Sequence, residues 1–332
     1  MELFDLVRQL CVSYGPSGSE EEIRRVLQDL ARPFADEIIT DTLGNLIVHK
    51  RGPGPRVMFS AHMDSIGLMV THIEKEGFLR VGRVGGISPQ KIAFASVRFQ
   101  NGVRGTIVPE EKAAFEKLTL DECYLDIGAS DDRQAKAAVQ VGDIAVYDSP
   151  AFLSGEHMVS PYLDDRAACA VLISALERIE QPVNDLYFVF SVQEEVGCRG
   201  AKTAAWALEP DYGLAVDVTD VNDTPGGTRE GTTKLGSGAG VKIMDRSVIS
   251  HPCVVEKLEQ AAKVHQIPVQ RDIMRAGGTD AGAIHLSREG VRSGGISIPC
   301  RYVHTPAETA HQRDLDACIR LVAAFAQTPL ER

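Results

Sequence analysis

The sequence predicts an α/β protein with a functional site at the carboxyl edge of a parallel sheet. The run Leu186–Val192 is almost entirely apolar or aromatic and shows no polar alternation, which is typical of a strand covered on both faces. Glu194 and Glu195 follow this run almost at once, and in open α/β sheets ligands gather at such strand ends. Similar strands alternate with amphipathic helical patterns elsewhere in the chain, as expected of this fold class. A pair of solvated glutamates that opens a loop is the simpler explanation for Glu194 and Glu195 alone.

Two helices and two strands are expected before residue 51. The apolar stripe of residues 3–10 predicts the first helix. Ser19, with Glu22 three residues later, fits a capping box at the start of a second helix. Strands are then expected over residues 37–41 and 45–49.

The next expected strand, Arg56–Ala61, runs directly into His62 and Asp64. In a His-x-Asp triplet the imidazole can bind a metal while the carboxylate orients its other ring nitrogen. A hydrogen-bonded structural histidine is the alternative for His62.

Residues 71–155 differ from the rest of the chain. Short β-rich pieces alternate there with glycine, asparagine, proline and aspartate turns, and only residues 131–139 look helical. This spacing predicts a small β-barrel or sandwich. Few histidines and acids cluster in it, so we expect an inserted non-catalytic domain, with an α/β domain made of residues 1–70 and 156–332.

Carboxylates recur at element ends after residue 155. Asp164 and Asp165 precede a helical stripe over residues 167–179, where capping is an ordinary role for an acid. Another buried strand, over residues 212–216, is expected to finish at Asp217.

The last hundred residues continue the α/β pattern. A tight loop over residues 277–282 should enter a short helix, and a strand over 291–298 should end at Pro299. His304 lies just beyond that strand end, and a final helix is expected over residues 311–326.

These strand ends and the helix start together supply two imidazoles and three carboxylates, a ligand set expected of a hydrolytic site that holds two divalent ions. One carboxylate must bridge ions that lie roughly 3.5–4 Å apart in such sites, and we expect Asp164 to do so. Glu194, next to a ligating Glu195, is placed to take a proton from a metal-bound water and to give it to a leaving amine. The predicted ligands are His62, Asp164, Glu195, Asp217 and His304.

Composition excludes several other classes. The net charge of −11 argues against a nucleic-acid partner. No apolar run is long enough to span a bilayer, so no membrane partner is expected. The seven cysteines are scattered and never form a C-x-x-C pair, which favours reduced thiols in a cytoplasmic protein.

At these residues the chain resembles the M42 metallo-aminopeptidases, which include the tetrahedral (TET) aminopeptidases and the glutamyl aminopeptidases. The resemblance covers essentially the whole chain. The segments that carry it are Ser60-Ala-His-Met-Asp64, Leu163-Asp-Asp-Arg166, Gln193-Glu-Glu-Val-Gly197, Val216-Asp217-Val218, Gly277-Gly-Thr-Asp-Ala-Gly282 and Pro299-Cys-Arg-Tyr-Val-His304.

The resemblance implies a three-layer catalytic domain of the zinc-exopeptidase kind, with residues 71–155 as an inserted dimerisation domain. It implies an aminopeptidase that removes amino-terminal residues from short peptides with two zinc or cobalt ions, in a homo-oligomer between a dimer and a dodecamer. One ion would take His62, Asp164 and Asp217, and the other Asp164, Glu195 and His304. Glu194 would be the general base, and Asp64 would support His62.

The chain departs from the family pattern at Ser65, where many members have glutamate, and in the altered segment over residues 108–113. The first departure bears on substrate preference, and a chain this compact could stop at a dimer.

Two other functions fit part of the pattern. A glycoside hydrolase would use the carboxylate pairs as acid and nucleophile, but it leaves His62 and His304 unexplained. A non-enzymatic metal-binding assembly protein would explain the ligands, but it has no use for Glu194.

Overall fold

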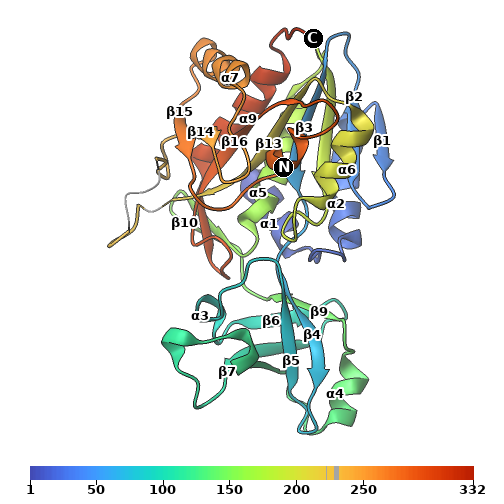
Figure 1. The fold of residues 1–332 in the computed structure, drawn as a ribbon, viewed down its shortest axis with the longest axis vertical. Coiled ribbons are helices and arrows are strands. Elements are labelled where there is room, and N and C mark those ends of the chain that lie inside the picture. Colours follow the sequence, from blue (N-terminus) through green and yellow to red (C-terminus); the bar gives the residue numbers. More distant parts are fainter. Residues whose placement is uncertain (222, 228–231) are drawn as a thin grey trace.

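The computed structural model describes residues 1–221, 223–227 and 232–332. They form an α/β part and a smaller β-barrel beneath it (Figure 1). The barrel is inserted between β3 (Arg56–His62) and β10 (Phe152–Ser154), and the chain enters and leaves it at the same end of the α/β part (Figure 1).

A mixed sheet of 11 strands, counted over the described residues, forms the centre of the α/β part. Its middle strands β12 (Asp185–Ser191), β3, β13 (Tyr212–Asp220) and β16 (Arg292–Arg301) pair in parallel, so their carboxyl ends meet at one edge. The other strands are β1 (Glu37–Thr40), β2 (Leu46–Lys50), β10, β11 (His157–Ser160), β14 (Ala239–Met244), β15 (Val269–Ile273) and β17 (Glu308–His311).

Helices cover both faces of this sheet and give three layers. Phe59 and Phe188 share a core with the larger helical layer, whereas their chain neighbours Met58 and Val189 pack with α6 and α8 on the other face. This two-sided burial explains why the strand sequences lack polar alternation. The larger layer contains α1 (Leu3–Val12), α2 (Glu21–Ala31), α5 (Leu163–Arg178), α7 (Pro252–Val264) and α9 (Gln312–Ala326), and the smaller one α6 (Arg199–Leu208) and α8 (Ala281–Ile284).

The inserted part is a closed barrel with its own apolar core. Closure pairs every barrel strand on both sides and leaves no free edge. The strands, in their order around the barrel, are β4 (Gly67–Ile73), β5 (Leu79–Val84), β8 (Cys123–Asp126), β7 (Arg104–Pro109), β6 (Ser96–Phe99) and β9 (Ile144–Tyr147), with α3 (Pro89–Ile92) and α4 (Asp132–Ala138) attached. The predicted three-layer α/β fold with a small β-rich insert is confirmed.

Some local predictions were wrong. The residue before α2 is Glu20, not Ser19, and the Glu22 carboxylate accepts a hydrogen bond from the Tyr14 backbone N–H at 2.9 Å instead of closing a capping box. Asp217 does not end its strand, and β16 continues through Pro299, because the parallel pairing of β13 with β16 extends to Asp220 and Cys300.

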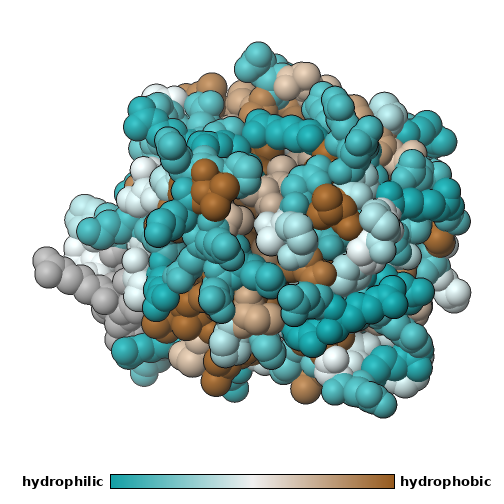
Figure 2. Space-filling model, turned by 90° about the horizontal axis from the view of Figure 1, so that it is seen from above, coloured by the Kyte–Doolittle hydropathy of each residue, from teal (hydrophilic) through white to brown (hydrophobic). Residues whose placement is uncertain are grey.

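None of the described helices is long and apolar enough to cross a membrane. The end of the molecule opposite the barrel is mostly hydrophilic, with separated apolar residues (Figure 2). At this end, the apolar side chains therefore lie mainly in the interior.

Candidate metal centre

The parallel strands bring the predicted residues to one edge of the sheet. His62 is the last residue of β3 and pairs with Ser191 at the end of β12, three residues before Glu194. A cavity of about 500 Å³ opens there. Its lining includes Glu194 and all five predicted ligands, His62, Asp164, Glu195, Asp217 and His304.

Asp164 occupies the centre of this group. His62 Nε2 lies 3.0 Å from Asp164 Oδ1, and His304 Nε2 lies 3.1 Å from Asp164 Oδ2. His304 Nε2 is also 3.2 Å from Glu195 Oε1. The two oxygens of one carboxylate therefore face two different imidazoles, an arrangement that suits a carboxylate placed between two cations.

The outer ring nitrogens of both histidines are held by the chain. His62 Nδ1 lies 3.1 Å from the Asp64 carbonyl oxygen and 3.6 Å from its carboxylate. His304 Nδ1 lies 2.7 Å from the carbonyl oxygen of Gly86, which belongs to the segment between β5 and α3. A hydrogen bond to the outer nitrogen orients an imidazole and leaves the other nitrogen free for a metal. Both Nε2 atoms face carboxylates in this way.

Asp165 was missed as a site residue. Two groups of three side chains bring their ligand atoms within 4.8 Å of one another. One group is His62, Asp165 and Asp217, and the other is His62, Asp164 and Glu195. The Asp165 Oδ2 atom accepts the His62 backbone N–H at 3.2 Å, while Oδ1 has no hydrogen-bond partner in the described part of the chain. In the described part of the chain the Asp164 oxygens face the imidazoles of His62 and His304, and Asp165 Oδ2 takes the His62 N–H, so neither carboxylate caps α5 and the capping explanation was wrong. Their adjacency in the sequence was the available signal.

Asp64 holds the backbone of the two glutamates. Its carboxylate accepts the Glu194 N–H at 2.9 Å, the Glu195 N–H at 3.3 Å and the Ser17 hydroxyl at 2.6 Å. These contacts are all shorter than its carboxylate contact with His62. Asp64 therefore links the segment between α1 and α2, which contains Ser17, to the segment after β12 that carries Glu194.

A second missed acid, Glu308, plays a parallel part on the other side. It is 1% exposed, and its two carboxylate oxygens accept the backbone N–H groups of Asp164 at 2.9 Å and His304 at 2.8 Å. The sequence offered only an acid four residues after His304, which is a weak signal. Glu308 fixes the relative position of Asp164 and His304.

The site concentrates negative charge in a buried place. Burial raises the pKa of Glu194 well above its usual value, and Asp217 and Asp280 raise it further while His62 opposes them. Burial alone would lower the pKa of His304, but its contacts with Asp164 and Glu195 raise it to about 12. The carboxylates that surround His304 thus favour its protonated form.

This donor set fits divalent cations. Imidazole and carboxylate are ligands that zinc and other first-row divalent ions accept. Ligands about 2.0–2.2 Å from one zinc ion in tetrahedral geometry lie roughly 3.3–3.6 Å apart, so the separations of 3.0 to 3.2 Å found here need to widen by only a few tenths of an ångström. A cation would also neutralise the buried carboxylates, including the unpartnered oxygen of Asp165.

Comparison with known proteins identifies relatives over nearly the whole chain. Residues 44–321 match the family model described as M42 glutamyl aminopeptidase. A lysyl aminopeptidase of Pyrococcus furiosus is 37% identical, with 98% of this chain and 96% of that protein aligned.

Solved structures agree with this match. An aminopeptidase from the archaeon Desulfurococcus kamchatkensis superposes with a TM-score of 0.94 at 38% identity, over 98% of this chain and 94% of the other. The TET1 peptidase of Pyrococcus horikoshii, described as assembling into a tetrahedron or a large octahedral shell, has a TM-score of 0.88 at 31% identity, with 98% and 99% covered.

Proposed function

This chain belongs to the M42 glutamyl aminopeptidase family, and on that basis we propose how its residues carry out the reaction. The protein is a peptide hydrolase of the exopeptidase class that removes residues from the amino terminus of peptides. The activity depends on metal, as in the family.

The proposed centre holds two divalent ions, zinc or cobalt, in each subunit. One ion would be held by His62, Asp164 and Asp217, and the other by Asp164, Glu195 and His304. The observation that carries this proposal is that Asp164 presents one oxygen to His62 at 3.0 Å and the other to His304 at 3.1 Å. Ions held there act as Lewis acids, which acidify water and polarise a carbonyl group.

Glu194 is the proposed general base. Its side chain is 13% exposed and lines the same cavity, and its Oε2 lies 3.9 Å from His62 Nε2. From this position it can accept the proton of a water beside the scissile carbonyl and return it to the leaving amine. The Asp64 carboxylate positions it through the Glu194 backbone N–H.

The test of this role is Glu194→Gln. The amide keeps the size of the side chain but cannot accept the proton, so kcat on aminoacyl-anilides should fall by about 10²- to 10⁴-fold. Elemental analysis should still find the wild-type metal content. Normal turnover in this variant would refute the assignment of the base.

Chelation separates the enzyme hypotheses. The glycoside hydrolase alternative is not favoured, and a carboxylate-only glycosidase would survive EDTA. The aminopeptidase should lose activity with EDTA and recover it with zinc or cobalt. An assembly protein without enzymatic activity would turn over no aminoacyl substrate when its metals are loaded.

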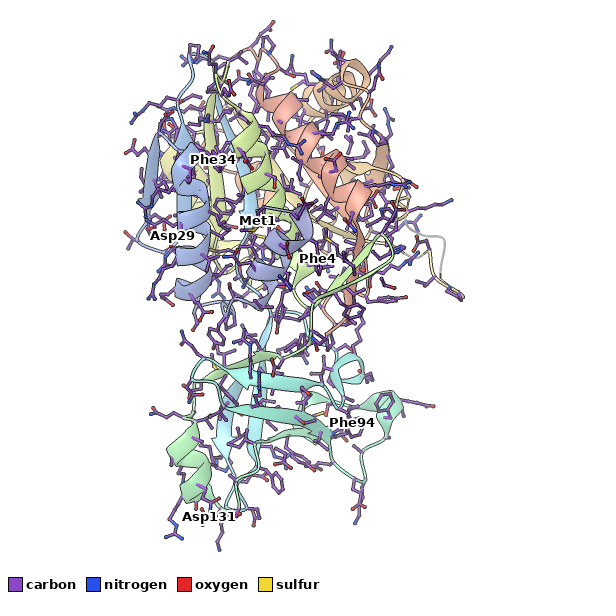
Figure 3. All side chains as sticks on the ribbon, turned by 180° about the vertical axis from the view of Figure 1, so that it is seen from behind. Met1, Phe4, Asp29, Phe34, Phe94 and Asp131 are labelled. Carbon is purple, nitrogen blue, oxygen red and sulfur yellow. The ribbon has the colours of Figure 1, made fainter. Side chains whose placement is uncertain are left out.

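The relatives of known structure support a homo-oligomer. We propose that the inserted domain, expected over residues 71–155, is the dimerisation domain. Its barrel strands run from Gly67 to Tyr147, Phe94 projects from it (Figure 3) with 67% of its surface exposed, and Phe115 is 54% exposed. Light-scattering mass measurements would separate a dimer from a dodecamer. A cytoplasmic location is proposed from the seven unpaired cysteines.

A further inference from the structure

A second cluster of ligand-type side chains lies against the proposed base, beyond the five ligands of the primary centre. One ligand atom each of Glu194, Cys198 and Asp280 lie within 4.8 Å of one another. The Cys198 Sγ atom is 3.1 Å from Glu194 Oε1. Glu194 and Cys198 both line the cavity, so an ion that enters it can reach this cluster.

Asp280 supplies an independent sign that a ligand belongs there. It is 2% exposed, and its Oδ2 atom accepts both the Ser60 hydroxyl at 2.6 Å and the Ser191 hydroxyl at 2.5 Å. Its Oδ1 atom is buried and has no hydrogen-bond partner among the described residues. A buried carboxylate oxygen without a donor is costly, and a cation would satisfy it.

The charges around the cluster are not balanced by nearby basic side chains. Within the described ranges, the one basic group inside 4 Å of Glu194 is His62, at 3.9 Å, and His62 already faces Asp164 at 3.0 Å. Two carboxylates and a thiol within 4.8 Å of one another therefore share little positive charge.

We propose that Glu194, Cys198 and Asp280 form a third, inhibitory cation site that takes thiophilic divalent ions such as zinc and cadmium. Sulfur at about 2.3 Å and oxygens at about 2.0–2.2 Å place ligand atoms roughly 3.5 Å apart around zinc, so small side-chain shifts close the site. The thiol proton leaves to solvent when the ion binds, because the ligand is the thiolate. Hard ions such as magnesium bind weakly, since thiolate is a soft ligand.

The functional consequence rests on the proposed role of Glu194. A carboxylate that ligates this third ion cannot accept a proton from water, so excess zinc should slow an enzyme whose primary ions are already in place. The site thus makes one metal an activator at low concentration and an inhibitor at high concentration.

The test uses the whole chain with zinc in its primary centre and free zinc removed by dialysis, and cadmium as the probe. Thiolate-to-cadmium charge transfer absorbs in the ultraviolet, and the proposed primary ligands are silent because they contain no sulfur. Cys198→Ser should lose this band. Cys253→Ser is the matched control, because Cys198 and Cys253 are the two cysteines that are not buried. Cys198→Ala repeats the test if the serine variant does not fold, as judged by circular dichroism.

Initial rates with added zinc give the second readout. Loss of one direct ligand should raise the zinc concentration needed for half inhibition by about 10-fold or more, while Cys253→Ser should match the wild type. A cadmium band of full size in both Cys198 variants, no band in the wild type, or unchanged zinc inhibition would overturn the third site. If Glu194→Gln stays active, the assignment of Glu194 as the base is wrong. The cadmium band, and its loss in the Cys198 variants, still decides whether the third site exists.

Discussion

Asp64→Asn tests whether a single buried carboxylate positions both the base and a metal-binding imidazole. Asp64 is fully buried, and it receives three hydrogen bonds, from Ser17, Glu194 and Glu195. An asparagine has nearly the same shape but only one acceptor oxygen. If that oxygen keeps the hydrogen bonds from Ser17 and Glu195, the amide N–H₂ group must face the Glu194 N–H. Two donors then point at each other and neither is satisfied.

The magnitude follows from these contacts. The substitution removes one charge-assisted hydrogen bond, worth about 1.5–3 kcal/mol, and leaves a buried donor unpaired. Because this hydrogen bond holds Glu194, we expect its loss to raise the activation free energy by about 2–3 kcal/mol. That increase corresponds to about a 30- to 150-fold drop in kcat/KM. Metal affinity should fall as well, because the His62 ring loses a carboxylate 3.6 Å from Nδ1.

The assay combines kinetics on an aminoacyl-anilide with metal content after dialysis. Ser17→Ala is the control, because it removes a donor to Asp64 but leaves the carboxylate and its contact with the Glu194 backbone in place. Its effect should be clearly smaller. Wild-type kcat/KM and wild-type metal retention in Asp64→Asn, with an unchanged melting temperature, would refute the positioning role.

Two predictions concern stability. Lys242 and Asp272 form an ion pair at 2.5 Å with side chains 1% and 2% exposed, so Lys242→Met should cost about 3–5 kcal/mol by stranding a buried carboxylate. The double variant Lys242→Met/Asp272→Leu should recover most of this free energy of unfolding, as measured by urea denaturation. An equal loss of stability in the single and the double variant would contradict the reasoning. Burial raises the pKa of Asp314 to about 6, although hydrogen bonds from the N–H groups of Gly236 and Gly238 lower it. Because the unfolded value is about 4, the folded state holds the extra proton between about pH 4 and 6, and stability from this group falls as pH rises through that window. Asp314→Asn should flatten the slope of unfolding free energy against pH there, and an unchanged slope would exclude Asp314 as its source.

Much of the fold was predictable because its signals are local. The run Leu186–Val192 indicated a strand buried on both faces, and the structure places Phe188 and Val189 in the cores on opposite sides of the sheet. The turn-rich composition of residues 71–155 indicated the small barrel. Strand ends were harder: β13 runs past Asp217 because its neighbour β16 offers pairing partners up to Cys300, and a single sequence does not show how long a neighbour is.

The candidate site, like the fold, was predictable only in part. The chemical types of His62, Asp164, Glu194 and His304, and their places near element ends, were visible in the sequence. Asp165 and Glu308 were missed because their parts depend on which backbone N–H groups they meet, and those groups belong to other segments.

The sequence by itself determined the period of each element, the burial of the strands and the kinds of ligand available, because these depend on neighbouring residues along the chain. Only the tertiary structure decided that Asp164 turns its two oxygens to two histidines, that Gly86 from beside the barrel holds His304, and that Asp280 reaches Cys198. The physical reason is that close packing of distant segments sets the distances between their polar atoms, and a hydrogen bond or a metal site responds to differences of a few tenths of an ångström.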